Sequence, residues 1–325
     1  MPLPEKALIA QIRRMVRAGK SARAARAVLA GIGDDCALLR PLPGRDMLVT
    51  TDFSLEGIHF RRDWHPADSV GHRCLARGLS DIAAMGGDPL AAFLSLALPR
   101  DLPQAWVRGF MRGLLRLAEN YGVVLAGGDT AESPDGILAD IIVVGTVPGG
   151  KAVMRSGARP GDRIYVTGEL GGSAAAVLAL RAKPKKKQRP QDYPRHFYPA
   201  PRLEFGRILR EKGLATATTD LSDGLSTDLA HICEESGVGA EIESTAIPRA
   251  RVGKPAHEVP LDLALDGGED YELLFTSPRG KRVPRQLAGV PISLIGYVTR
   301  RQKVFLMNQR VGYELIPRGW EHFRC

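Results

Sequence analysis

The sequence is poor in cysteine and has no long hydrophobic run. Its 325 residues contain four single cysteines that form no C-x-x-C pair: Cys36, Cys74, Cys233 and Cys325. This spacing argues against a disulfide framework and against a zinc site, so we expect small buried side chains and one terminal thiol. No apolar stretch approaches the roughly 18 residues of a membrane span, and the basic, amphipathic start lacks the apolar run of a signal peptide. We therefore expect a cytoplasmic protein with no membrane partner.

Several familiar catalytic motifs are also absent. GELGGSAAA, residues 168–176, lacks the G-K-[ST] ending of a P-loop and the full G-x-G-x-x-G pattern. There is no H-R-D or D-F-G set of a protein kinase and no G-x-S-x-G elbow for an acyl nucleophile. The seven histidines make no zinc spacing. These absences exclude the common nucleotide-binding loops and the serine hydrolases.

Basic residues outnumber acidic ones by 45 to 36, which gives a formal net charge of +9. The densest basic run is KPKKKQRPQDYPRH, residues 183–196, where the prolines predict a surface loop instead of a helix. A nucleic-acid-binding protein is one hypothesis for such a chain, and it predicts weaker binding when Lys185, Lys186 and Lys187 are neutralised. No helix-turn-helix, RNA-recognition or zinc-finger pattern accompanies the run, so we expect no nucleic-acid partner.

Apolar runs alternate with helical patterns along the chain, which is typical of α/β or α+β domains. In the first half we expect strands at 47–52, 91–99, 123–126 and 137–147, and helices at 75–85 and 103–121. In the second half we expect strands at 163–168, 271–276, 292–298 and 303–307, and helices after Gly172 and near 202–212 and 224–236. A glycine pair at 149–150 divides the chain into two α/β domains, residues 1–149 and 150–325.

Carboxylates gather in short Gly-, Ser- and Thr-rich stretches. One of them, TTDLSDGLSTDL at 218–229, holds Asp220, Asp223 and Asp228. Other stretches contain Asp34, Asp35, Asp52, Asp81, Asp129, Asp266, Glu269 and Asp270. Several of them directly follow an apolar run, so we expect them at strand ends, where loops build clefts.

Each carboxylate has a local explanation. An Asp beside Gly is typical of turns, and Asp223 is placed to cap the helix expected at 224–236. As a set, however, the carboxylates indicate a metal site. Turns and caps accept Asn or Ser equally well, whereas a hard cation is best held by carboxylate oxygen. The hydroxyls of Thr50, Thr51 and Ser222 add oxygen ligands. Because each Mg²⁺ usually takes one or two carboxylates plus substrate phosphates, the set predicts several ions around a polyphosphate.

Seven stretches, in this order, resemble the thiamine-monophosphate kinase family: GIGDDCALL, TTDFSLEGIHF, LSDIAAMGGDPL, GGDT, MRSGARPGD, TDLSDGLSTDLAHI and LDGGEDYELLF. The resemblance runs from about residue 31 to the WEHF near the end. It implies the two-domain architecture of aminoimidazole ribonucleotide synthetase, with an N-terminal domain that forms a homodimer and a C-terminal α/β domain. It also implies transfer of the γ-phosphoryl group of ATP onto thiamine monophosphate.

The resemblance assigns roles to particular residues. Mg²⁺ ions would be held by Asp35, Thr50, Thr51, Asp52, Asp81, Asp129, Asp220 and Asp223. ATP would contact Gly128, Asp129, Arg155 and Ser222. Thiamine monophosphate would contact His59, Glu269 and Trp320. No general base is expected, because the accepting phosphate, with a second pKa of about 6, is already ionised at neutral pH.

Three departures from the family pattern stand out: Gly78 occupies a position where relatives commonly have Asn, the 183–196 run looks like an insertion, and the tail reads WEHF where an aromatic residue such as Tyr is also seen. An alternative within the same superfamily is a synthetase that uses ATP to activate a carbonyl, an amide or selenide. Selenide chemistry would need a reactive residue such as Cys36, which heads an apolar run and is expected to be packed.

Overall fold

Two units, each built around its own sheet, make up the computed structural model of the chain, which describes residues 5–16, 27–30, 38–182, 189–253, 256–309 and 311–321. The first unit comprises Met1–Ile82 and Gly87–Gly150, and the second comprises Ala83–Gly86 and Lys151–Cys325. None of the helices in these described ranges is both long and apolar enough to span a membrane.

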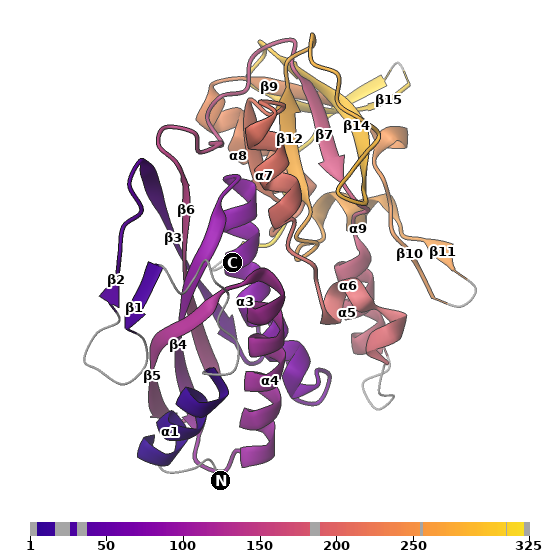
Figure 1. Ribbon diagram of the computed structural model, residues 1–325. Helices are drawn as coiled ribbons and strands as arrows, with labels where there is room; N and C mark the ends of the chain where they lie inside the picture. The colour runs from indigo at the N-terminus through magenta and orange to yellow at the C-terminus, as the bar shows by residue number, and fades with distance from the viewer. Residues whose placement is uncertain are drawn as a thin grey trace. The chain divides into compact units, whose positions relative to one another are not determined.

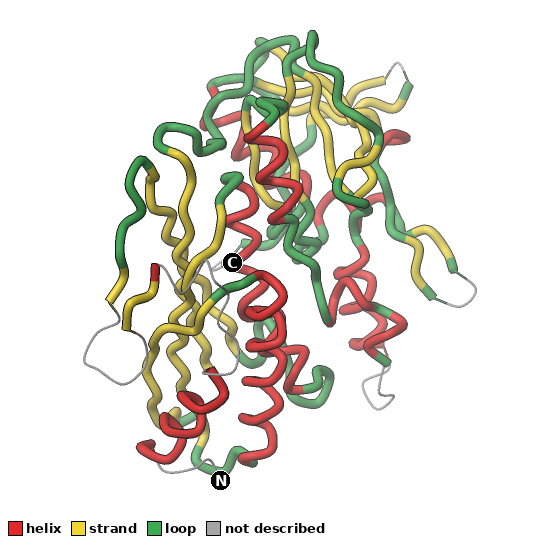
Figure 2. Tube along the Cα trace, viewed as in Figure 1, coloured by secondary structure: helices red, strands yellow, loops and turns green. Residues whose placement is uncertain are grey.

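The first unit contains a four-stranded sheet in the order β3-β6-β4-β5. Its strands are β3 (Arg45–Leu55), β4 (Asp88–Pro99), β5 (Val124–Ser133) and β6 (Leu138–Pro148), and only the β4–β5 pair is parallel. The helices are α1 (Glu5–Val16), α3 (Ala67–Ala84) and α4 (Gln104–Tyr121), and a small hairpin joins β1 (Val28–Ala30) to β2 (Leu38–Leu39). The long strands and the long helices α3 and α4 are yellow and red in Figure 2.

Glycines let α3 and α4 approach each other closely. A Cβ atom on Gly71 of α3 would lie 2.7 Å from the backbone carbon of Phe110, and one on Gly113 of α4 would lie 2.6 Å from that of Asp68. Gly78 packs α3 onto the sheet in the same way, since a Cβ there would lie 2.6 Å from a methyl group of Val143. The glycine that departs from the family pattern therefore has a packing role.

The second unit contains a larger mixed sheet in the order β16-β15-β9-β14-β7-β12-β8, with β13 paired to β14. Figure 1 labels β7, β9, β12, β14 and β15 of this sheet. Its strands are β7 (Arg163–Thr167), β8 (Ala217–Asp220), β9 (Gly239–Glu243), β12 (Leu273–Ser277), β13 (Gln286–Leu287), β14 (Val290–Thr299), β15 (Val304–Asn308) and β16 (Val311–Glu314). A separate hairpin pairs β10 (Arg251–Val252) with β11 (His257–Glu258). The α-helices are α5 (Gly172–Ala182), α6 (Pro194–Phe197), α7 (Leu203–Glu211), α8 (Leu225–Ser236) and α9 (Leu261–Asp266), with 3₁₀ turns at Pro190–Asp192 and Ser244–Ala246.

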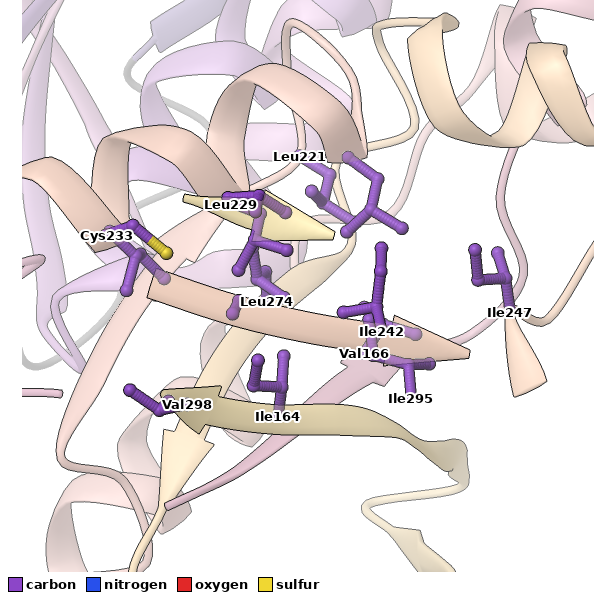
Figure 3. Packing of buried hydrophobic residues seen from close by; sticks show 14 of the residues in the cluster. Ile164, Val166, Leu221, Leu229, Cys233, Ile242, Ile247, Leu274, Ile295 and Val298 are labelled. Carbon is purple, nitrogen blue, oxygen red and sulfur yellow. The ribbon is translucent and has the colours of Figure 1, made fainter. Parts of the chain in front are cut away.

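The sheet of the second unit is covered on both faces. Alternate residues of β7 point to opposite sides, so Ile164 and Val166 join the core that includes Leu229 and Cys233 of α8 (Figure 3). On the other side, Tyr165 stacks on Phe275 with ring centroids 5.2 Å apart. Apolar side chains therefore pack against both faces of this part of the sheet.

The expected strands and helices lie within or beside observed elements, but several short observed elements, among them β8, β9, β10, β11, β13 and β16, were not expected, and the basic run differs from expectation. The short polar strands β8 (ATTD) and β9 (GAEIE) carry too little apolar pattern to be found from the sequence. The expectation that the basic run contains no helix is wrong for its described part, although most of that part lies at the surface as expected. Over its described part, 189–196, Pro190 and Pro194 begin helical turns, where a missing N–H costs nothing, and His196 is buried. Residues 183–188, with the three lysines, lie outside the described ranges.

Cys74 and Cys233 are free and buried, as expected, and burial raises the pKa of each thiol to about 12. Such thiols remain protonated at neutral pH and act as small apolar side chains. Cys36 and Cys325 lie outside the described residues.

Candidate active site

In the first unit, strand β3 and helix α3 bring three of the predicted metal ligands together. The Thr50 hydroxyl donates a short hydrogen bond to the Asp81 carboxylate. Asp52, two residues further along β3, shares this face of the strand, and its carboxylate lies 3.7 Å from the guanidinium Nε of Arg77. This face therefore presents two carboxylates and a hydroxyl, all oxygen donors, next to one arginine that the sequence analysis did not select.

Thr51 points to the opposite face of the same strand. Its hydroxyl donates to a carboxylate oxygen of Asp140 on β6 at 2.7 Å. The side-chain oxygens of the two neighbouring threonines are thus separated by the strand itself, because successive side chains alternate.

Asp129 and Gly128 lie in the middle of β5, at the edge of the sheet. Gly128 has φ 148°, and a Cβ atom there would lie 2.6 Å from the backbone carbon of Leu94, so only glycine fits without strain. The Asp129 side chain is exposed and accepts a 2.8 Å hydrogen bond from the N–H of Thr130. Residues 127 and 128 are glycines without side chains, so the exposed carboxylate of Asp129 lies next to main chain that their side chains do not cover.

His59 lies in the turn that follows β3. The backbone N–H of Leu55 donates to its Nδ1 at 3.0 Å, so in the neutral ring the proton is on Nε2. The ring is half-buried. Asp35, the remaining metal ligand predicted in this part of the chain, lies outside the described residues.

In the second unit, main-chain hydrogen bonds join two acidic loops. The first begins at Asp220, the last residue of β8, and continues through Ser222 and Asp223; the second is the 266–272 stretch that precedes β12. The N–H of Glu269 donates to the carbonyl of Ser222 at 2.8 Å, and Leu221 N–H donates to the carbonyl of Glu272 at 2.8 Å. Residues predicted to hold metal, ATP and thiamine monophosphate are therefore brought together within one unit.

The C-terminal segment joins the same loops. The N–H of Trp320 donates to the carbonyl of Asp223 at 2.9 Å, and that of Gly319 donates to the Thr227 hydroxyl at 3.1 Å. A Cβ atom on Gly319 would lie 2.6 Å from that hydroxyl oxygen. The indole of Trp320 remains 49% exposed, so its ring is available for stacking although its backbone is fixed.

Asp228 caps α8, and the expectation that Asp223 does so is wrong. The N-cap residue is Gly224, which has no side-chain hydrogen bond at this end. One carboxylate oxygen of Asp228 instead accepts the N–H groups of Asp223 at 3.2 Å and Gly224 at 3.0 Å. Burial, followed by the nearby Asp223 charge, raises the pKa of Asp228 to about 7. The cap is therefore supplied from inside the helix, by the side chain of Asp228.

Asp270 is a second buried carboxylate. Its two oxygens accept the N–H groups of Gly171 at 2.7 Å and Ser173 at 3.3 Å, at the start of α5. Burial raises its pKa to about 7, although these two hydrogen bonds favour the charged form. Arg155, the predicted ATP contact, is exposed in the segment before β7, and its charge acts to lower the pKa of Asp228.

The two units each hold part of the predicted site. Within the described ranges, no three His, Cys, Asp or Glu side chains gather as a ready metal cage. The donors present are carboxylates and hydroxyls, which suit Mg²⁺, an ion that relies on one or two carboxylates together with water and phosphate. The residue types fit the ion, and a site completed by substrate phosphates requires no all-protein cage.

Comparison with known proteins identifies the class. The family model described as AIR synthase related protein, N-terminal domain, matches residues 33–147, and the corresponding C-terminal domain model matches residues 159–308. The aminoimidazole ribonucleotide synthetase-like two-domain α/β architecture expected from the sequence is confirmed.

Relatives narrow the class. A thiamine-monophosphate kinase of Escherichia coli O157:H7 is 41% identical over 304 residues, which cover 90% of this chain and 91% of the relative. A crystal structure of thiamine-monophosphate kinase from Stenotrophomonas maltophilia K279a has a TM-score of 0.80 at 33% identity and covers 96% and 99% of the two chains. The structure of AaThiL complexed with AMPPCP and TMP has a TM-score of 0.76 at 33% identity and covers 99% of each chain. The chain belongs to the thiamine-monophosphate kinase family.

Proposed function

We propose that the chain is a kinase that transfers the γ-phosphoryl group of ATP to the phosphate of thiamine monophosphate, giving thiamine diphosphate and ADP. The observation that carries this proposal is the joining of the 220–223 loop, the 266–272 loop and Trp320 by main-chain hydrogen bonds. Family membership and a relative that holds AMPPCP, an ATP analogue, together with TMP support it. In the reaction an oxygen of the accepting phosphate bonds to the γ-phosphorus while the bond to the β-phosphate oxygen breaks.

The residues divide this work by chemistry. Bound Mg²⁺ would neutralise and orient the phosphates. Its holders would be Asp35, Thr50, Asp52, Asp81, Asp129, Asp220 and Asp223, whereas the hydroxyl of Thr51, on the opposite face of β3, donates to Asp140. ATP would be bound by Gly128, Asp129, Arg155 and Ser222. The guanidinium of Arg155 can form two parallel hydrogen bonds to one phosphate group. The carboxylate of Glu269 and the exposed indole of Trp320 suit a cationic aromatic substrate, together with His59. The acceptor is ionised at neutral pH, so no residue needs to remove a proton from it.

A product assay tests the proposal. Purified protein is given ATP, MgCl₂ and thiamine monophosphate, and thiamine diphosphate is resolved from thiamine and quantified with ADP. We expect equal amounts of ADP and thiamine diphosphate, none with EDTA, and losses of orders of magnitude in Asp220→Asn and Asp223→Asn proteins that remain folded. ADP without thiamine diphosphate would favour the synthetase alternative, and unfolding of both variants would favour purely structural carboxylates.

We also propose that the enzyme is a homodimer whose copies meet through the sheet of the first unit. Met47, Val49 and Phe53 alternate along the edge strand β3 and are 45%, 66% and 54% exposed, which forms an apolar stripe on one face. A second copy would cover this stripe. Light scattering at micromolar concentration should give the dimer mass for the native chain and the monomer mass for Val49→Asp/Phe53→Asp; a monomeric native chain refutes this proposal.

A further inference from the structure

The backbone next to the proposed substrate carboxylate is strained. In the described chain, four non-glycine residues have positive φ, and two of them lie in one three-residue stretch, Glu269 (φ 63°) and Tyr271 (φ 51°). The left-handed region is unfavourable for both residue types and persists only where the surroundings impose it. The contacts that impose it therefore determine where the Glu269 carboxylate points.

The backbone supplies one part of this restraint. The N–H groups of Glu269 and Tyr271 donate to the carbonyls of Ser222 and Leu221 at 2.8 and 2.9 Å. These bonds tie the stretch to the neighbouring acidic loop, and the two loops adjoin β8 and β12, which pair with each other in the sheet. The stretch has a further anchor.

Side chains of the same stretch supply that anchor. Glu272 is 2% exposed, and its carboxylate accepts hydrogen bonds from the Thr167 hydroxyl at 2.6 Å and from Arg202 Nε at 2.7 Å. A terminal nitrogen of Arg202 donates to the other carboxylate oxygen, so the guanidinium and the Glu272 carboxylate form a bidentate pair. Arg195, near the end of the basic run, has its Nη1 atom 3.5 Å from Oε1 of Glu272. Glycine is required at 168, because a Cβ there would overlap the Glu272 carboxylate.

Stability alone does not account for such a pair. A buried ion pair contributes little net stability compared with apolar residues of similar volume, because both charges lose their hydration. A two-pronged pair does restrict geometry, because the planar guanidinium meets a carboxylate in few orientations. Arg202 directly precedes α7, so it joins the strained stretch to a regular element of the second unit.

We propose that Arg202 is a positioning residue that, through Glu272, holds the Glu269–Tyr271 backbone in its strained form and so aims Glu269 at the cationic thiamine moiety. The ligand part of this inference rests on the proposed function. The positioning part depends only on contacts within the second unit.

The test uses Arg202→Met in the full-length protein, with Arg207→Met on the same helix as the matched control. The side chain of Arg207 is 43% exposed, and its contact with Glu211 is a surface pair at 4.0 Å. Calorimetry with thiamine monophosphate and MgCl₂ should show binding weakened about tenfold or more in Arg202→Met, with ATP binding changed less than about threefold. Hydrogen exchange of the 266–273 peptide should become faster in the same variant and remain unchanged in the control.

A second variant separates the effect of Arg202 on the position of Glu269 from its effect on the stability of the fold. Arg202→Met/Glu272→Gln removes both charges, so its melting temperature should exceed that of Arg202→Met, while its binding of thiamine monophosphate stays weak. Recovery of both properties, or unchanged exchange at 266–273 in Arg202→Met, overturns the proposal. Faster exchange in a protein whose native form neither binds nor phosphorylates thiamine monophosphate would uphold the positioning role and refute the proposed function instead.

Discussion

Replacing Asp228 by Asn and by Ala separates the two effects of its carboxylate. The oxygen that caps Asp223 and Gly224 is retained by Asn and lost with Ala, and the buried charge disappears in both. Two buried N–H groups left without an acceptor cost about 1–3 kcal/mol each. Asp228→Asn should therefore exceed Asp228→Ala by about 2–6 kcal/mol in the free energy of unfolding, at any pH.

The native protein should differ from both variants in its pH dependence. Because the folded pKa of Asp228 is about 7, well above the ordinary value, its contribution to stability is present at low pH and lost as pH rises through 7. The raised pKa corresponds to a penalty of up to about 4 kcal/mol at pH 8. Asp228→Asn should accordingly be more stable than the native chain at pH 8 and similar to it at pH 4.

Urea unfolding at pH 4, 6 and 8, in EDTA so that no metal intervenes, measures these differences. Turnover is measured under the conditions of the product assay. Asp228→Asn should retain most of the activity, while Asp228→Ala should lose it because the N–H of Asp223 no longer has its acceptor. Equal stability of the two variants would show that the capping oxygen contributes nothing, and equal loss of turnover would show that the charge itself matters.

Three further results are expected. Gly319→Ala places a Cβ 2.6 Å from the Thr227 hydroxyl, so KM for thiamine monophosphate should rise about tenfold in kinetic assays, whereas Gly280→Ala, with open space around it, should leave KM unchanged. Gly128→Ala combines a positive φ with a backbone clash, so thermal unfolding should show a loss of at least about 2 kcal/mol; an unchanged melting temperature would contradict the observed backbone at β5. The pKa of Asp270 is raised to about 7, so its stabilising contribution is lost as pH rises through 7, and Asp270→Asn should show a smaller drop in unfolding free energy between pH 5 and 8 than the native chain.

Much of the candidate site is readable from the sequence because its residues stand in short, separate stretches. Asp220, Ser222 and Asp223 occupy one such stretch and Glu269 another, and oxygen-rich composition marks both. The sequence does not predict that these two stretches are joined. Their connection depends on main-chain hydrogen bonds between Ser222 and Glu269 and between Leu221 and Glu272, and main-chain groups are the same in every sequence.

Other features were hidden for local reasons. Asp228 and Asp223 look alike in sequence, and only the direction of the chain at Gly224 decides which of them caps α8. Arg77, Arg202 and Glu272 carry no pattern that distinguishes them from surface charges. Beyond Ala126, β5 continues through GGDTAES, a stretch without apolar alternation, because its parallel pairing with β4 holds the backbone extended.

The attachment of Trp320 to Asp223 has a consequence for limited proteolysis. Residues 317–320 follow β16, after the strands of the second unit's sheet, so no strand pairing depends on them. Cleavage just ahead of this segment should therefore leave the sheet paired and the protein folded, while the indole proposed to stack on the substrate is lost.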